Sequence, residues 1–284
     1  RPMQAPPEDD WCARVSLHYS SGQQRPGFYK TLQAAVLAWE RCPERNGTIR
    51  IDDNGRYGRR GTPLKINLNG RRLRIEAGPS HIPCIPTRVD ANGGGGHLEI
   101  DGVFVEGELR ADNLGSLHLS HSTILRSIAA QGTHEFSVHI QKSMCGPIRM
   151  PMHDCELTIH DSIVDGRGDA AIAPIHGHES HGPRIEVIRT TILGASQIRS
   201  IEHAVDSLFA GNIDAHEAPN GRLQHCATPL PQRHTHSPSC ITITEDQDEQ
   251  GDQLPIQFFS REIGQPGYAV SSEIAAPALR SNAS

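Results

Sequence analysis

Residues 157–166, LTIHDSIVDG, contain the pattern that decides the fold. A short strand with alternating apolar side chains is followed by a small residue, two apolar residues and a glycine. The same order recurs along the chain. Further copies are LEIDGVF at 98–104, LHLSHSTIL at 117–125, VHIQKSMCG at 138–146, IEVIRTTILG at 185–194 and, in a weaker form, Ile201 with SLFAG at 207–211.

The spacing of this pattern predicts how the strands are arranged. The small anchor residues are separated by 21, 20, 19, 29 and 16 residues, and they are Gly102, Thr123, Ser143, Ser162, Thr191 and Ser207. Most intervals are close to one turn of a parallel β-helix, and the longest holds an insertion at 167–183. We therefore predict an all-β protein, a right-handed parallel β-helix or solenoid. A propeller or sandwich would favour Asn-Gly hairpins and more than the 4% of aromatic residues found here.

The two ends of the chain depart from the repeat. Leu32, Ala35, Val36 and Trp39 recur at helical spacing after Thr31, a suitable N-cap, which predicts a capping helix over 31–42. Residues 1–27 are rich in Pro, Gln and Ser and predict a loosely ordered N-terminal arm. The β-helix is expected over 28–225. Residues 226–284 predict an irregular Pro- and His-rich C-terminal extension, with one strand at 241–244.

Composition excludes some classes of function. The chain has 284 residues and a formal charge of −6, so it lacks the basic face that nucleic-acid binding requires. No apolar run is long enough to span a membrane. The seven cysteines are odd in number and irregular in spacing, which indicates a reduced, cytoplasmic protein. The start at Arg1 shows no signal peptide, and a processed segment before it would leave export open.

Two resemblances support the fold. The segments YKTLQAAVLAW at 29–39 and NGTIRIDDNGRYG at 46–58 are similar to the opening of pectin-lyase-like β-helix proteins. In those proteins a short helix closes the first turn of the solenoid, and a first strand leads to a Gly-x-Tyr turn. The resemblance implies the same arrangement here, because an open end would expose apolar side chains and unpaired backbone.

The second resemblance covers most of residues 30–270. CGPIRMP at 145–151, LTIHDSIVDG, the stretch TTILGASQIRSIEHAVDSLFAGNIDAHEAPNGRLQHC at 190–226 and QPGYA at 265–269 resemble an uncharacterised bacterial β-helix family. Its genes often lie beside baseplate genes of phage-tail-like contractile injection systems. The chain departs from that family by ending in ALRSNAS rather than in an acidic, aromatic tail, and by lacking a basic, aromatic run after Cys226.

The first candidate site is the cluster Asp161, Asp165 and Asp169 with Arg167. Enzymes with β-helix folds use such carboxylates to hold calcium or as acid and base, and a basic residue can take the proton beside a uronate. Asp-Gly and Gly-Asp are also ordinary turn formers, so turn chemistry is the competing interpretation.

Two further groups contain histidines. His176, His178 and His181, with Glu179, have metal-ligand spacing within the insertion. The stretch 176–186 also faintly resembles a motif of polygalacturonases, but Glu186 stands where those enzymes have a lysine. A solvated polar insertion is the alternative. Cys226, His234, His236 and Cys240 offer two thiols and two imidazoles for a tetrahedral zinc ion that would order the Pro-rich loop; the alternative is a mobile loop.

Two hypotheses for function follow. The first is a non-catalytic structural or binding module within a phage-tail-like or contractile injection assembly, with other assembly proteins or a glycan as partners. The second is a polysaccharide lyase or glycoside hydrolase acting on an acidic glycan. A homo-oligomer fits either hypothesis. A local arginine cluster is interpreted as a solvated rim or as an anion-binding patch, and its members are Arg56, Arg59, Arg60, Arg71, Arg72 and Arg74.

Overall fold

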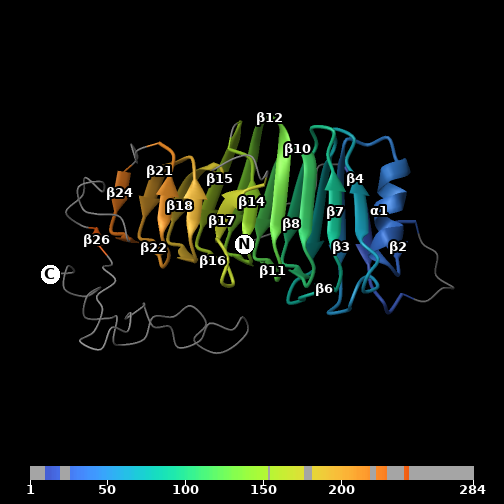
Figure 1. The fold of residues 1–284 in the computed structure, drawn as a ribbon. Helices are drawn as coiled ribbons and strands as arrows, with labels where there is room; N and C mark the ends of the chain where they lie inside the picture. The colour runs from blue at the N-terminus through green and yellow to red at the C-terminus, as the bar shows by residue number, and fades with distance from the viewer. Residues whose placement is uncertain are drawn as a thin grey trace.

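The computed structural model describes residues 10–19, 26–152, 154–175, 181–217, 222–228 and 240–242. These residues form a long stack of parallel strands with one helix, α1, at one end (Figure 1). Each turn of the chain, here called a rung, pairs in parallel with the rung before and the rung after it. The predicted all-β architecture with parallel, solenoid-like pairing is therefore confirmed.

The strands of the described residues form two sheets. The larger sheet contains β1 (Trp11–Val15), β2 (Phe28–Tyr29), β3 (Asn46–Ile51), β4 (Leu64–Asn67), β5 (Arg72–Ala77), β7 (Val89–Asn92), β8 (His97–Asp101), β10 (Leu109–Ser120), β12 (Ile128–Gln141), β14 (Ile148–Met150), β15 (Cys155–His160), β17 (Ile172–Pro174), β18 (Arg184–Ile188), β20 (Ser196–Ile198), β21 (Ser200–Val205), β23 (Ile213–Ala215) and β24 (Arg222–Gln224). The smaller sheet contains β6 (Cys84–Ile85), β9 (Phe104–Val105), β11 (Thr123–Ile124), β13 (Met144–Cys145), β16 (Ile163–Asp165), β19 (Thr191–Leu193), β22 (Leu208–Phe209), β25 (Ala227–Thr228) and β26 (Ile241–Thr242).

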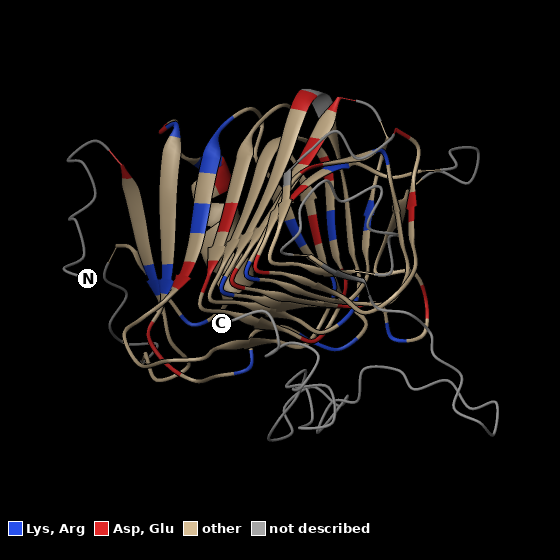
Figure 2. Cartoon of the chain, turned by 90° about the vertical axis from the view of Figure 1, so that its left-hand side faces the viewer, with Lys and Arg blue, Asp and Glu red and all other residues tan. Residues whose placement is uncertain are grey.

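The larger sheet bends within each rung. The first part of β10 pairs with β7 and its second part pairs with β8, with irregular register between Ala111 and Ser116. One rung therefore presents three faces: two from the larger sheet and one from the smaller. Viewed along the stack, successive rungs follow nearly the same path, and acidic and basic residues fall on several neighbouring strands (Figure 2).

The core lies inside the rungs and is built from stacked aliphatic side chains. The register places one buried column on successive strands of the larger sheet: Leu98, Leu117, Val138, Leu157, Ile185 and Ile201. Each of these side chains is at most 1% exposed. Burial of one such side chain is worth about 1.5–3 kcal/mol, and the repetition of this gain rung by rung drives the stacking.

A corner ladder runs where the larger sheet turns into the smaller one. In it a buried hydroxyl accepts a hydrogen bond from a backbone N–H of the preceding rung and donates to the carbonyl two residues earlier. Ser143 Oγ accepts from Ser122 N at 3.1 Å and donates to Gln141 O at 2.8 Å. The hydroxyl members of the ladder are Ser122, Ser143, Ser162, Thr190 and Ser207.

The residue before each ladder position has a left-handed backbone. These residues have φ between 47° and 51°, and they are His121, Lys142, Asp161, Arg189 and Asp206. This geometry corrects the predicted anchors at Thr123 and Thr191, which lie one residue after the ladder, and at Gly102, which lies one residue before it. Ser122 and Thr190 were missed because a small residue follows each of them directly.

Helix α1 (Leu32–Arg41) forms where its spacing predicts. The Thr31 side chain accepts a hydrogen bond from Ala34 N at 3.2 Å, and Leu32, Ala35, Val36 and Trp39 are buried. The far end of the helix is held by Arg71, which stacks over the Trp39 ring at 4.2 Å. The Arg71 guanidinium also donates to the carbonyl oxygens of Glu40 and Cys42, so it satisfies groups that the last helical turn leaves unpaired.

Two predicted boundaries were wrong. Within the predicted arm 1–27, Trp11–Val15 form strand β1, which pairs along its whole length with β3 and buries Ala13 and Val15. Asp53 ties this strand to the next turn by accepting from Ser16 Oγ and Tyr57 Oη, both at 2.6 Å. At the other end the parallel pairing continues past 225 through β25 and β26. The strand predicted at 241–244 is confirmed over Ile241–Thr242; the rest of the predicted extension lies outside the described residues.

Candidate functional site

A groove of about 1260 Å³ runs along the turns that lead from the smaller sheet back into the larger one. These turns precede β4, β7, β10, β12 and β17, or continue into β14, so they occupy equivalent places on successive rungs. Five arginines line the groove: Arg60, Arg88, Arg126, Arg149 and Arg167. Three carboxylates line it as well: Glu106, Glu108 and Asp169.

Two of the groove carboxylates are already bound to arginines. Glu106 accepts from Arg56 at 2.8 Å, and this hydrogen bond lowers the pKa of the Glu106 carboxyl. Glu108 pairs with Arg110 at 2.8 Å. Both carboxylates are therefore neutralised by cations, which leaves the arginines as the dominant charge of the groove.

The groove arginines differ in how they are held. Arg149 is half-buried and donates to Ala170 O at 2.9 Å, and burial lowers the pKa of its guanidinium. Arg88 pairs with Asp90 at 2.7 Å. Neither Arg126 nor Arg167 forms a side-chain ion pair with a residue that the structure describes. These two guanidinium groups are available to an anion in the groove.

The predicted cluster of Asp161, Asp165, Asp169 and Arg167 is divided between three places. Asp161 lies at the corner of the rung, where Arg189 donates to both its oxygens at 2.6 and 2.9 Å and lowers the pKa of its carboxyl. Asp165 is 9% exposed and accepts from the backbone N–H of Arg167 at 2.8 Å, as in an Asx turn. Arg167 and Asp169 alone line the groove.

The histidine insertion is described only in part. His181 Nε2 lies 3.3 Å from Asp214, and its ring lies 5.2 Å from that of His216. Glu186 faces His160 at 3.4 Å on the outer surface of the larger sheet. His176, His178 and Glu179 lie outside the described residues.

The predicted zinc ligands are also described only in part. Cys226 and Cys240 are 1% and 2% exposed, and both lie at the inside corner of the last described rungs. His234 and His236 lie outside the described residues. Within the described ranges no three His, Cys, Asp or Glu side chains are grouped so as to hold a metal ion.

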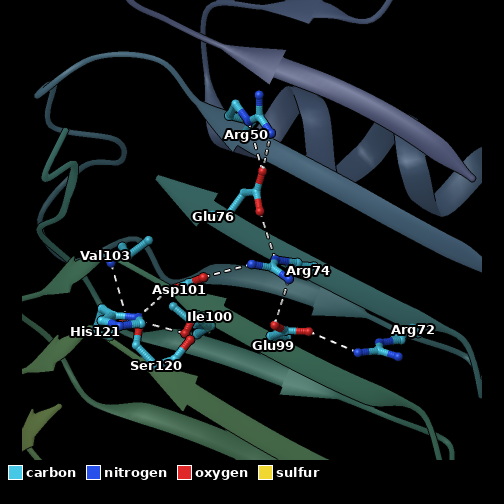
Figure 3. Close-up of polar contacts among 11 residues, drawn as sticks. Arg50, Arg72, Arg74, Glu76, Glu99, Ile100, Asp101, Val103, Ser120 and His121 are labelled. Atoms are coloured by element: carbon cyan, nitrogen blue, oxygen red, sulfur yellow. Dashed lines mark hydrogen bonds and ion pairs between the residues drawn. The ribbon is translucent and has the colours of Figure 1, made fainter. Parts of the chain in front are cut away.

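The arginine cluster at 56–74 does not form one patch. Arg74 pairs with Glu76, Glu99 and Asp101, and Arg72 extends the network through Glu99 (Figure 3). Arg71 holds the end of α1, as described above. Of the six arginines only Arg60 lines the groove.

One feature of the sheet surface was missed from the sequence. His118 and His139 face each other on neighbouring strands with ring centroids 4.5 Å apart, and burial lowers the pKa of both imidazoles. Both residues alternate with buried apolar residues, and this alternation is the signal that places them on one outward face.

Comparisons with protein-family models, with curated proteins and with solved structures find no match to this chain. No helix in the described ranges is long and apolar enough to cross a membrane.

Proposed function

We propose that this protein is a non-catalytic binding module that holds an extended acidic glycan in the arginine-lined groove. Its frame is a right-handed parallel β-helix, and α1 closes the first rung. The observation that carries the proposal is the convergence of five arginines from successive rungs on one groove whose glutamates are already paired.

The geometry of the stack suits a linear polymer. Neighbouring parallel strands are about 4.8 Å apart, so equivalent turns repeat at that interval along the groove. Arg88 and Arg126 precede strands β7 and β12, and Arg149 lies within β14, a third strand of the same face. A chain with one carboxylate or sulfate on each sugar could meet a cation on several rungs, and guanidinium groups bind such oxygens in pairs.

The carboxylates argue for binding rather than hydrolysis. A general acid needs a raised pKa to keep its proton near neutral pH. The pKa of Glu106, a carboxylate of the groove, is lowered instead by the hydrogen bond from Arg56. The competing hypothesis, a glycan lyase or hydrolase, depends on Arg167 and Asp169, which line the groove together.

The resemblance to the baseplate-associated family supports a second part of the proposal. A rigid stack that presents a glycan-binding groove could serve as a receptor-binding or connecting part of a phage-tail-like assembly. Other assembly proteins would then be its partners, and the glycan would be its ligand.

Calorimetry with polygalacturonate and with a sulfated glycan tests the proposal. The double variant Arg126→Gln/Arg167→Gln should weaken binding by about tenfold or more, and the affinity of the natural chain should fall as salt rises. Arg41→Gln/Arg45→Gln is the matched control, because it removes the same charge from two exposed residues that do not line the groove.

Two outcomes would contradict the proposal. If the natural chain binds neither polymer, the groove is not a site for acidic glycans. Release of unsaturated or reducing ends that disappears in Asp169→Asn would identify the protein as an enzyme.

A further inference from the structure

Cysteines occupy the last two described positions of the corner ladder. Cys226 stands where Ser207 stands one rung earlier: its Sγ lies 3.3 Å from Gln224 O, as Ser207 Oγ lies 2.7 Å from Val205 O. His225, the residue before it, has a left-handed φ of 52°, close to the 47–51° found before each hydroxyl of the ladder. A thiol has thus replaced the hydroxyl without changing the turn.

Cys240 occupies the same place on the next rung. Strand β26 pairs in parallel with β25, with Ala227 opposite Ile241 and Thr228 opposite Thr242. Cys226 and Cys240 come directly before these two strands, so each lies beside the other across the rung boundary. Both are free thiols in the structure and almost fully buried.

We propose that Cys226 and Cys240 form a disulfide under oxidising conditions and so close the last described rung covalently. Residues at equivalent positions of adjacent parallel strands are about 4.8 Å apart, within the Cα separation of about 4.4–6.8 Å found across disulfides. Formation of the bond requires both side chains to rotate and the Cβ atoms to approach to about 3.5–4.5 Å.

The other described cysteines have no such neighbour. Cys145 lies between Ile124 and Val164 in its ladder of the smaller sheet. Cys84 is paired with Phe104, Cys155 with Phe136 and Cys12 with Thr48. Cys42 is the C-cap residue of α1. Among the described residues, thiols therefore meet at equivalent positions of adjacent rungs at one place, the end of the corner ladder.

The reaction requires an external oxidant, and a glutathione-type disulfide supplies it. One protein thiolate attacks the oxidant and releases one glutathione, and the second protein thiolate then displaces the other glutathione. Two protein thiols are oxidised to one disulfide, and one disulfide is reduced to two thiols. Burial raises the pKa of Cys226 to about 11, so the exchange is slow while the rung is closed and proceeds when it opens.

This inference goes beyond the proposed glycan binding, because it concerns the end of the stack rather than the groove. It also uses two of the four predicted zinc ligands, so a zinc ion and the disulfide exclude one another. The link would add a covalent bond to β26, which two pairs of residues join to β25, and the redox state of the surroundings would control that bond.

Peptide mapping of the full chain tests the inference. The protein is unfolded with reductant, refolded in a glutathione redox buffer, alkylated and cleaved with trypsin. Cleavage after Arg222, Arg233 and Arg261 places Cys226 and Cys240 in separate peptides, 223–233 and 234–261. We expect these peptides to be joined, with a mass two hydrogens below their sum, and to separate on reduction. The oxidised protein should melt roughly 5 °C or more above the reduced protein.

Cys226→Ser is the matched control, because serine is the residue that fills the ladder on the preceding rungs. It should keep the circular dichroism of the natural chain and lose both the linked peptide and the effect of reductant on melting. A parallel sample of folded protein, dialysed for days against glutathione disulfide, covers the case in which refolding fails.

Three outcomes would overturn the inference. The first is alkylation of all seven cysteines after both treatments. The second is a link from Cys226 or Cys240 to a different cysteine. The third is one equivalent of bound zinc that blocks the link until a chelator removes it, which would assign the thiols to a metal clip.

Discussion

Two networks of polar contacts run along the same stack, and they differ in almost every physical respect. The corner ladder joins rungs through neutral hydroxyls that are 2–4% exposed, as in Ser122, Ser143 and Ser162. The ion-pair network on the first rungs joins Arg50, Glu76, Arg74 and Asp101 on the outer face, with Arg74 38% exposed (Figure 3). Both networks connect residues that are far apart in sequence.

The difference between the two lies in what happens when a member is lost. A buried N–H that loses its acceptor cannot bind water instead. The loss of that hydrogen bond therefore costs the full desolvation energy of the N–H group. A surface charge without its partner is solvated again, and salt screens the pair in any case. The ladder should therefore govern the stability of the stack, while the ion pairs adjust it.

The largest effect is expected at the centre of the ladder. Ser143→Val leaves the N–H of Ser122 without its acceptor, while Gln141 O keeps its hydrogen bond from His121 N, and we expect a loss of about 3 kcal/mol in the free energy of unfolding, measured in urea. Ser143→Cys should cost much less, because Cys226 fills the equivalent position. A loss below about 1 kcal/mol in Ser143→Val would show that the ladder does not carry this energy.

Asp53 combines features of both networks. It carries a charge, as the members of the ion-pair network do, but it is buried like the hydroxyls of the corner ladder, at 7% exposed. Burial alone would raise the pKa of its carboxyl, but hydrogen bonds from Ser16, Tyr57 and two backbone N–H groups outweigh this and lower the pKa to about 2. The folded pKa lies below the unfolded value, so the contribution is complete above about pH 4 and is lost as the pH falls towards 2.

We therefore expect Asp53→Asn to lose about 2 kcal/mol at pH 7 and almost nothing at pH 2. Urea unfolding of both proteins across this range measures the difference. A constant difference over the whole range would mean that packing, and not the charge of Asp53, holds the first strand.

The smallest effect is expected in the exposed network. Arg74→Gln removes a cation that pairs with Glu76, Glu99 and Asp101, and we expect a loss of about 1 kcal/mol at low ionic strength and less in high salt. Urea unfolding at two salt concentrations measures it. A loss as large as that of Ser143→Val, and independent of salt, would remove the distinction between the two networks.

The sequence predicted the parts of the fold that depend on local periodicity. Helix α1 was located because four apolar residues recur at helical spacing behind Thr31. Strand β1 was missed because only Ala13 and Val15 mark its buried face, and the residues of β3 that pair with it come 36 positions later. The predicted ladder positions were wrong by one residue where two small residues are adjacent. The left-handed backbone turn decides which of the two joins the ladder, and residue composition does not reveal that turn.

The candidate site was less predictable than the fold. Arg126, Arg149 and Arg167 meet in the groove because the lengths of the intervening rungs bring their turns into line. Those lengths differ, as the corner ladder shows with sequence separations of 21, 19, 28 and 17. The predicted aspartates were close in sequence, but the turn at the corner directs Asp161 to one side and Asp169 to the other.

The hydrogen bonds from Arg71 to the end of helix α1 have a consequence for folding on the ribosome. The helix leaves the exit tunnel before Arg71, whose guanidinium donates to its last carbonyls and lies 29 residues after Cys42. At the ordinary pace of translation this delay lasts seconds, far longer than a helix needs to form. Until the segment before β5 emerges, the last carbonyls of the nascent helix have only water as a partner, so α1 is synthesised before β3 and β4 but its end is fixed only after both have been made.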